Sequence, residues 1–234
     1  MAWFGKKAEA EKKQSATVAL EGLSVDMLSS QLKGLEEELY GAGFSVRRLE
    51  FPSSSSSENI PGLTQNPKLL KSAQSLGIIA ALDRARTFLD ATSNATPGEI
   101  TLLTGSVLTT AAWLATLPLE YGERVALYRW LDELEFTVFG QHRLNLVILL
   151  DCLPDHIDLQ ETVIAPVGWA DRSVPDVAKL RERYIEAAKL FPGTKIIPCY
   201  KEELLKPDSE VRNELWNLVR RIVLKTNIPP KRTT

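Results

Sequence analysis

The sequence contains few of the residues that mark secreted, metal-binding or membrane-spanning proteins. Among its 234 residues it has two cysteines, Cys152 and Cys199, and two histidines. Such a composition excludes a disulfide-rich secreted scaffold, and neither histidine has metal ligands at the usual spacing, so no metal site is predicted. The longest apolar runs, such as Leu146 to Leu150, are much shorter than the ~20 residues of a transmembrane helix. We therefore expect a reduced, cytoplasmic protein without a transmembrane segment.

Charge of one sign is also missing, because 28 basic residues face 30 acidic residues and the formal net charge is -2. This balance argues against a nucleic-acid partner. The length suits one domain, predicted over residues 16–225 and flanked by a flexible N-terminal tail, 1–15, and a C-terminal tail, 226–234. Residues 53–66 form a predicted Ser/Pro-rich loop inside that domain.

Short apolar segments alternate with longer helical patterns along the domain. The predicted strands are Thr17–Leu20, Ser45–Phe51, Glu99–Leu103, Leu146–Leu150 and Lys195–Pro198. The predicted helices begin and end near Leu28–Tyr40, Pro67–Ala91, Val107–Leu117, Glu123–Phe139, Val177–Leu190 and Ser209–Lys225. This order predicts an α/β fold with a mostly parallel five-stranded sheet and helices on both faces. Ligands of such sheets bind beyond the carboxyl ends of the strands.

The segment after the first predicted strand resembles the phosphate-binding loop of the thymidylate kinase family, which reads Glu-Gly-x-Asp-Gly-x-Gly-Lys-Ser/Thr-x-Gln. Glu21, Gly22, Ser29 and Gln31 stand at matching places. Two glycine positions are occupied by Val25 and Met27, and Leu28 replaces the lysine that would reach the outer phosphates. The residues of this degenerate P-loop are Gly22, Ser24, Met27, Leu28, Ser29 and Ser30.

The resemblance continues in register from about Thr17 to Leu224. Leu49-Glu50-Phe51-Pro52, Ala81-Leu82-Asp83-Arg84-Ala85 and Thr109-Thr110-Ala111-Ala112-Trp113 fall where the family has its substrate-pocket motifs. By this resemblance the fold is that of P-loop nucleoside monophosphate kinases, and residues 155–175 are a lid-like segment with Arg172 as its candidate arginine. The resemblance implies substrate-pocket equivalents at Glu50, Phe51, Pro52, Arg84, Thr110 and Trp113.

Several charged residues of the family are absent from these positions. Thr104-Gly105-Ser106 replaces the family's Asp-Arg-Tyr, and Glu50 replaces the arginine that holds the acceptor phosphate. Phosphoryl transfer depends on positioning and charge neutralisation, so no catalytic residue is assigned. Arg84 has two interpretations of equal weight: it reaches a thymine edge as in the family, or it is a surface residue that pairs with Asp83 or Asp90.

The leading hypothesis is a catalytically inactive thymidylate-kinase-like protein, a pseudokinase that serves as a regulatory or scaffold subunit with at most weak nucleotide binding. The first alternative is an active dTMP or nucleoside monophosphate kinase in which Arg48, Arg84 and Arg172 contact phosphates; ATP and magnesium are implied only in that case. The second alternative is an adaptor tethered through Trp3, Phe4 and the adjacent lysines of the N-terminal tail. Family resemblance implies a homodimer, and a heterodimer with an intact kinase is the other expectation.

Overall fold

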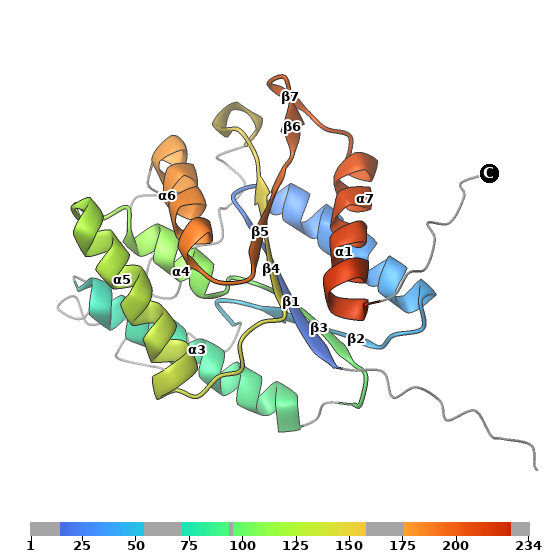
Figure 1. The fold of residues 1–234 in the computed structure, drawn as a ribbon, viewed down its shortest axis with the longest axis horizontal. Coiled ribbons are helices and arrows are strands. Elements are labelled where there is room, and N and C mark those ends of the chain that lie inside the picture. Colours follow the sequence, from blue (N-terminus) through green and yellow to red (C-terminus); the bar gives the residue numbers. More distant parts are fainter. Residues whose placement is uncertain (1–14, 54–71, 94–95, 158–175, 226–234) are drawn as a thin grey trace, which may run out of the picture.

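A five-stranded parallel sheet forms the centre of the protein in the computed structural model, which describes residues 15–53, 72–93, 96–157 and 176–225. The strands lie in the order β2-β3-β1-β4-β5 (Figure 1). Their bounds are β1 Ala16–Gly22, β2 Val46–Glu50, β3 Ile100–Thr104, β4 Leu146–Asp151 and β5 Thr194–Pro198. All four pairings are parallel, which confirms the predicted α/β class and is consistent with a P-loop-like fold.

Burial of the strands follows their position in the sheet. Every residue of β4 is buried, as are six of the seven residues of β1, because helices cover both faces of these central strands. The edge strands β2 and β5 carry exposed residues along much of their length. The uninterrupted apolar runs of the sequence therefore correspond to the central strands of the sheet, as expected for parallel strands that are covered on both sides.

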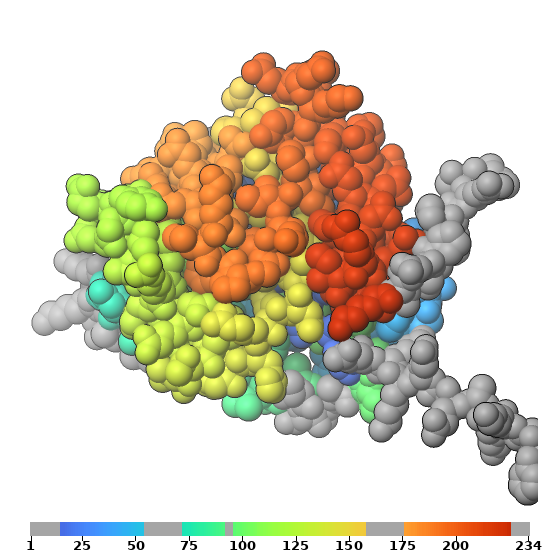
Figure 2. All heavy atoms as spheres, viewed as in Figure 1, coloured from blue at the N-terminus to red at the C-terminus, as the bar shows by residue number. Residues whose placement is uncertain are grey.

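The helices form one layer on each face of the sheet. α1 (Val25–Gly41) and α7 (Asp208–Val219) pack together on one face. α3 (Ala73–Ser93), α4 (Val107–Leu114), α5 (Tyr121–Glu133) and α6 (Val177–Leu190) cover the other face (Figure 1). In the space-filling view α5 and the chain from α6 to α7 form the near side of the molecule and hide most of the sheet (Figure 2). None of the helices in the described ranges is both long and apolar enough to span a membrane.

The predicted leucine stripe of α1 is confirmed, since Leu28, Leu32, Leu35 and Leu39 are all buried. The helix nevertheless starts at Val25, three residues earlier than predicted. Ser24 is the reason, because its side chain accepts a hydrogen bond from the backbone N–H of Met27 and caps the first turn.

The bounds of α4 and α5 also differ from their predictions. α4 stops at Leu114, before the predicted Leu117, and Thr116 Oγ1 donates 2.7 Å to Trp113 O just beyond its end. α5 begins at Tyr121 behind a capping box formed by Glu120 and Glu123, and the chain continues from Leu134 to Val138 as a π-helical turn. A short hairpin, β6 (Tyr200–Lys201) with β7 (Leu204–Leu205), was not predicted.

Several sequence predictions concern residues outside the described ranges. These are most of both tails, residues 54–66 of the Ser/Pro-rich loop, the start of the helix predicted from Pro67, and residues 158–175 of the lid-like segment. Arg172 belongs to this group. Those assignments stay predictions.

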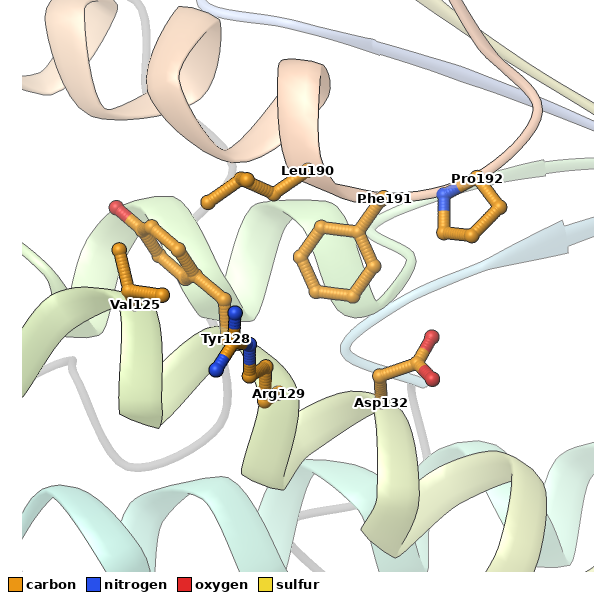
Figure 3. A pocket seen from close by; sticks show the side chains of 7 residues that line it. All are labelled: Val125, Tyr128, Arg129, Asp132, Leu190, Phe191 and Pro192. Atoms are coloured by element: carbon orange, nitrogen blue, oxygen red, sulfur yellow. The ribbon is translucent and has the colours of Figure 1, made fainter.

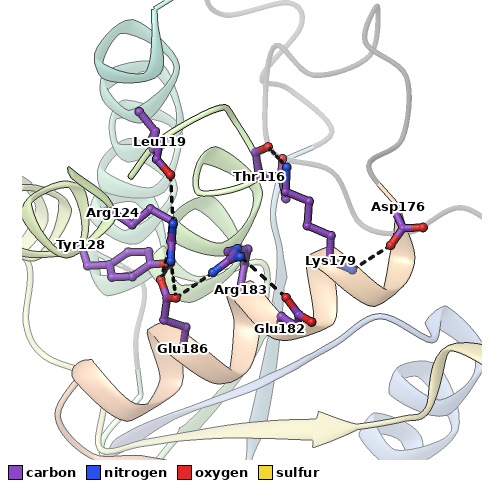
Figure 4. Close-up of polar contacts among 9 residues, drawn as sticks. All are labelled: Thr116, Leu119, Arg124, Tyr128, Asp176, Lys179, Glu182, Arg183 and Glu186. Atoms are coloured by element: carbon purple, nitrogen blue, oxygen red, sulfur yellow. Dashed lines mark hydrogen bonds and ion pairs between the residues drawn. The ribbon is translucent and has the colours of Figure 1, made fainter. Parts of the chain in front are cut away.

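A polar cluster holds α5 against α6 (Figure 4). Arg124 makes two hydrogen bonds of 2.8 Å to the carboxylate of Glu186, and Tyr128 donates a further bond of 2.8 Å to the same group. Arg183 donates to Glu186 from one turn earlier at 2.7 Å. The hydrogen bond from Arg124 holds the pKa of Glu186 below its ordinary value, so the carboxylate stays charged and satisfies all three donors. The cluster fixes α6 beneath the sheet, where it also packs against α4.

Candidate functional site

The carboxyl edge of the sheet is where this fold would bind a ligand. β1 ends there at Gly22, β3 at Thr104 and β4 at Asp151. In an open parallel sheet the crevice beyond these ends is bounded by the loops and helix N-termini that follow the strands. The residues singled out from the sequence are concentrated at this edge, so their positions determine what it can bind.

The connection from β1 to α1 is too short to encircle a phosphate. It contains only Leu23 and Ser24, because β1 ends at Gly22 and α1 starts at Val25. The N–H groups of Met27 and Leu28 bond to Ser24 Oγ and Ser24 O, at 3.2 and 3.0 Å. These donors therefore close the first turn of the helix, where a P-loop would turn its backbone N–H groups towards phosphate oxygens.

Apolar side chains fill the space around this connection. Leu23, Met27 and Leu28 are each exposed by 6% or less and belong to the main core. Gly22 is retained for a packing reason, since a Cβ at this position would lie 2.8 Å from the carbonyl oxygen of Leu150. The match of Gly22 to the P-loop glycine therefore reflects contact between neighbouring strands.

Two further residues of the degenerate P-loop lie on α1 beyond that connection. Ser30 Oγ donates to a carboxylate oxygen of Asp208 at 2.5 Å, and the neighbouring Gln31 donates to Asp208 O at 3.2 Å. Ser29 is exposed to solvent. The polar residues of α1 thus connect it to the start of α7, and sequence reasoning did not find this partner because Asp208 lies 178 residues away along the chain.

Glu21 is buried at the end of β1, with 1% of its surface exposed. It accepts a hydrogen bond of 2.7 Å from the backbone N–H of Ser106 and another from the hydroxyl of Thr109, both at the start of α4. Tyr184 of α6 donates to the same Thr109 hydroxyl at 2.9 Å. The sequence identified Glu21 only as a motif match, whereas the structure shows it as a buried link between β1 and α4.

Burial raises the pKa of Glu21 above its ordinary value, although its hydrogen bonds and nearby Arg84 act in the opposite direction. The folded state therefore favours the protonated carboxyl more strongly than the unfolded state does. Its contribution to stability is complete below the unfolded pKa of about 4.3 and is lost as the pH rises through the folded pKa.

Arg84 is buried, with 3% of its surface exposed, and it makes an ion pair with Glu135. Its guanidinium also donates to Gly105 O at 3.2 Å and to Thr110 Oγ1 at 3.0 Å. The predicted surface pairing with Asp83 or Asp90 is wrong. Asp83 instead accepts bonds of 2.9 and 2.5 Å from the backbone and hydroxyl of Ser53. No local pattern marked Glu135 as the partner, because 51 residues separate it from Arg84.

The remaining pocket equivalents do not converge on one open cavity. Glu50 is exposed and pairs with Arg48 at 3.2 Å, while Phe51 and Trp113 are buried in the core. Pro52 is exposed beside Phe51. Gly105 adopts a φ of +76°, and a Cβ there would lie 2.1 Å from Phe51 O, so this turn admits only glycine.

An open pocket lies away from these residues, between α5 and the turn from α6 to β5 (Figure 3). Its volume is about 310 Å³, and Val125, Tyr128, Leu190, Phe191 and Pro192 supply most of its lining. Arg129 and Asp132 point into the same region from α5 (Figure 3). Over the residues that the structure describes, no group of three His, Cys, Asp or Glu side chains is placed to hold a metal ion.

Replacing Glu21 by Gln should remove the pH dependence that this carboxyl imposes on stability. We expect the free energy of unfolding of Glu21→Gln to increase relative to that of the unmodified protein as the pH rises from about 4 to about 8. The reason is that the amide never ionises, whereas the carboxyl of Glu21 does. Urea unfolding at several pH values measures the difference. Exposed Glu37, changed to Gln, is the matched control, and equal pH profiles for all three proteins would contradict the assignment.

Breaking the Arg84–Glu135 pair should destabilise the fold strongly. Arg84→Met leaves a buried carboxylate without its cation, at an expected cost of about 3–5 kcal/mol, whereas the double variant Arg84→Met/Glu135→Leu should recover most of that loss. Urea unfolding of both variants tests this, with exposed Arg86→Met on the same helix as the control. A double variant as unstable as the single one would show that the ion pair is not the cause.

Comparison of the chain with protein-family models gives no match, and comparison with curated proteins gives none either. Functional inference for this protein therefore depends on its motif correspondences and on the geometry of the carboxyl edge.

Proposed function

We propose that this chain is a thymidylate-kinase-like protein that does not transfer phosphoryl groups and serves as a regulatory or scaffold subunit. The observation that carries the proposal is the β1–α1 connection of two residues, packed with Leu23, Met27 and Leu28. A phosphate cradle needs free backbone N–H groups around an open space, together with a cation. This connection offers neither, so at most weak nucleotide binding is expected.

Charge at the remaining positions supports the same conclusion. Thr104 is buried, Gly105 carries no side chain, and exposed Glu50 would repel an acceptor phosphate. Arg84 keeps the family's residue type, but Glu135 neutralises its charge inside the protein. Four phosphate or magnesium contacts of the family are thus lost at Leu28, Glu50, Thr104 and Gly105, and such contacts are each worth a few kcal/mol in a transition state.

The alternative of an active kinase needs Arg48, Arg84 and Arg172 to face phosphates. Arg48 pairs with Glu50 and lies 3.9 Å from a carboxylate oxygen of Glu36, and Arg84 is buried. Arg172 lies outside the described residues, as does the N-terminal tail that the adaptor alternative uses. Neither alternative gains support from a contact in the described part of the chain.

Calorimetric titration with ATP–magnesium, and separately with dTMP, tests the loss of function. We expect no saturable heat for either ligand below the millimolar range and no consumption of ATP with dTMP or other nucleoside monophosphates, because the cradle is closed and its cation is absent. Saturable binding of both ligands, with turnover of a nucleoside monophosphate, would overturn the proposal in favour of the active kinase.

A subunit without catalysis needs a surface for its partner, and α3 offers one. Ile78, Leu82 and Leu89 are exposed by 40%, 38% and 68%, and their spacing of four and seven residues puts them on the same side of the helix. A stripe of this kind is suited to packing against another helix. We propose that it joins two copies of this chain, with an intact kinase as the alternative partner.

Charge placed in the stripe should separate the proposed dimer. Leu82→Asp and Leu89→Asp should each shift the sedimentation of the protein from dimer to monomer, since a carboxylate would be buried at the interface without a partner. Leu204→Asp, at an equally apolar and exposed position on β7, should leave the dimer intact. A wild-type chain that sediments as a monomer would contradict the homodimer.

A further inference from the structure

We propose that Cys152 and Cys199 form a reversible intramolecular disulfide that joins the carboxyl ends of β4 and β5. They are the two cysteines of the chain, and both are free thiols in this structure. Each directly follows the last residue of its strand, since β4 ends at Asp151 and β5 at Pro198. This site is separate from the β1–α1 connection on which the proposed function rests.

The strand register puts the two cysteines opposite each other. Asp151 pairs with Pro198 at the end of the ladder, and the backbone N–H of Cys199 continues it with a bond of 2.8 Å to Asp151 O. The next pair in this register is Cys152 with Cys199. Neighbouring strands lie about 4.8 Å apart, which is within the range of about 4.4–6.8 Å that disulfides span between Cα atoms.

The side chains complete this arrangement. Cys199 is fully buried and Cys152 is 3% exposed, and the thiol of Cys199 donates to Ile197 O at 3.7 Å. Interaction between the two thiols lowers the pKa of Cys152, and the same interaction together with burial raises the pKa of Cys199. Cys152 is therefore the thiol that ionises first and the one that would attack an oxidant.

The chemistry is thiol–disulfide exchange with a small-molecule disulfide such as oxidised glutathione. The Cys152 thiolate attacks one glutathione sulfur, forms a mixed disulfide and releases the other glutathione as a thiolate. Cys199 then loses its proton and attacks the sulfur of Cys152, which releases the second glutathione. The protein loses two protons and two electrons, which is the mass of two hydrogen atoms, and the glutathione disulfide gains them as two glutathione thiols.

Closing this bond would constrain the segment between the two strand ends. That segment includes α6, whose Arg181 already bonds to Asp151 at 2.6 and 2.8 Å, next to Cys152. The bond would also fix the start of the β6–β7 hairpin, because Cys199 immediately precedes Tyr200. Crosslinking the two ends of this segment restricts the conformations of the unfolded state and so stabilises the fold.

The experiment incubates the purified full-length chain with oxidised glutathione and then blocks remaining thiols in denaturant. We expect an intact mass lower by two hydrogen atoms, no blocked cysteine, a peptide that joins Cys152 to Cys199, and a thermal midpoint raised by roughly 5–10 °C. A reducing agent should reverse each change. Cys152→Ala and Cys199→Ala are the matched controls, and neither should show the mass loss or the rise in midpoint.

A second arm addresses slow access of the oxidant to the buried thiols. The chain is oxidised in urea, where both thiols are exposed, and is then returned to buffer. Recovery of the native circular dichroism with a raised midpoint supports the proposal, because the folded state then accommodates the bond. A crosslinked chain that does not regain this spectrum, or that melts below the reduced protein, would overturn it.

Discussion

Burial of α4 beneath the sheet is the constraint on which the rest of the carboxyl edge depends. All eight residues of this helix are buried, so its polar groups must find partners inside the protein. Glu21 accepts bonds from Ser106 and Thr109, while Arg84 donates to Thr110 and is balanced by Glu135. Two buried ionisable side chains near the carboxyl edge of the sheet are thereby occupied by internal contacts.

Apolar packing also fills the connection between β1 and α1. Leu23, Met27 and Leu28 stabilise the core in the place where a phosphate cradle would have stayed open and solvated. An apolar connection adds hydrophobic stabilisation, whereas a glycine-rich one costs conformational entropy and exposes backbone donors. The closed space at this connection and its hydrophobic packing are therefore two consequences of the same apolar side chains.

Polar contacts within each helix layer, and between α6 and β4, hold the remaining elements in place. Glu186 joins α5 to α6 through Arg124 and Tyr128, and Asp208 joins α7 to α1 through Ser30. Asp151 and Arg181 fasten α6 to the end of β4, directly beside Cys152. Polar contacts thus connect these helices to one another and to the end of β4, while Ile78, Leu82 and Leu89 of α3 are exposed.

The sequence alone determined the α/β class, the five strands and the buried stripe of α1, because these depend on local apolar periodicity. It also showed that Val25, Met27 and Leu28 stand where a P-loop would have glycines and a lysine, since those are single positions in a motif. Only the tertiary structure decided that Arg84 pairs with Glu135, that Ser30 contacts Asp208 and that the two cysteines follow neighbouring strand ends. Each of these contacts joins residues far apart in the chain, and no local pattern encodes which distant strand ends and helices will meet.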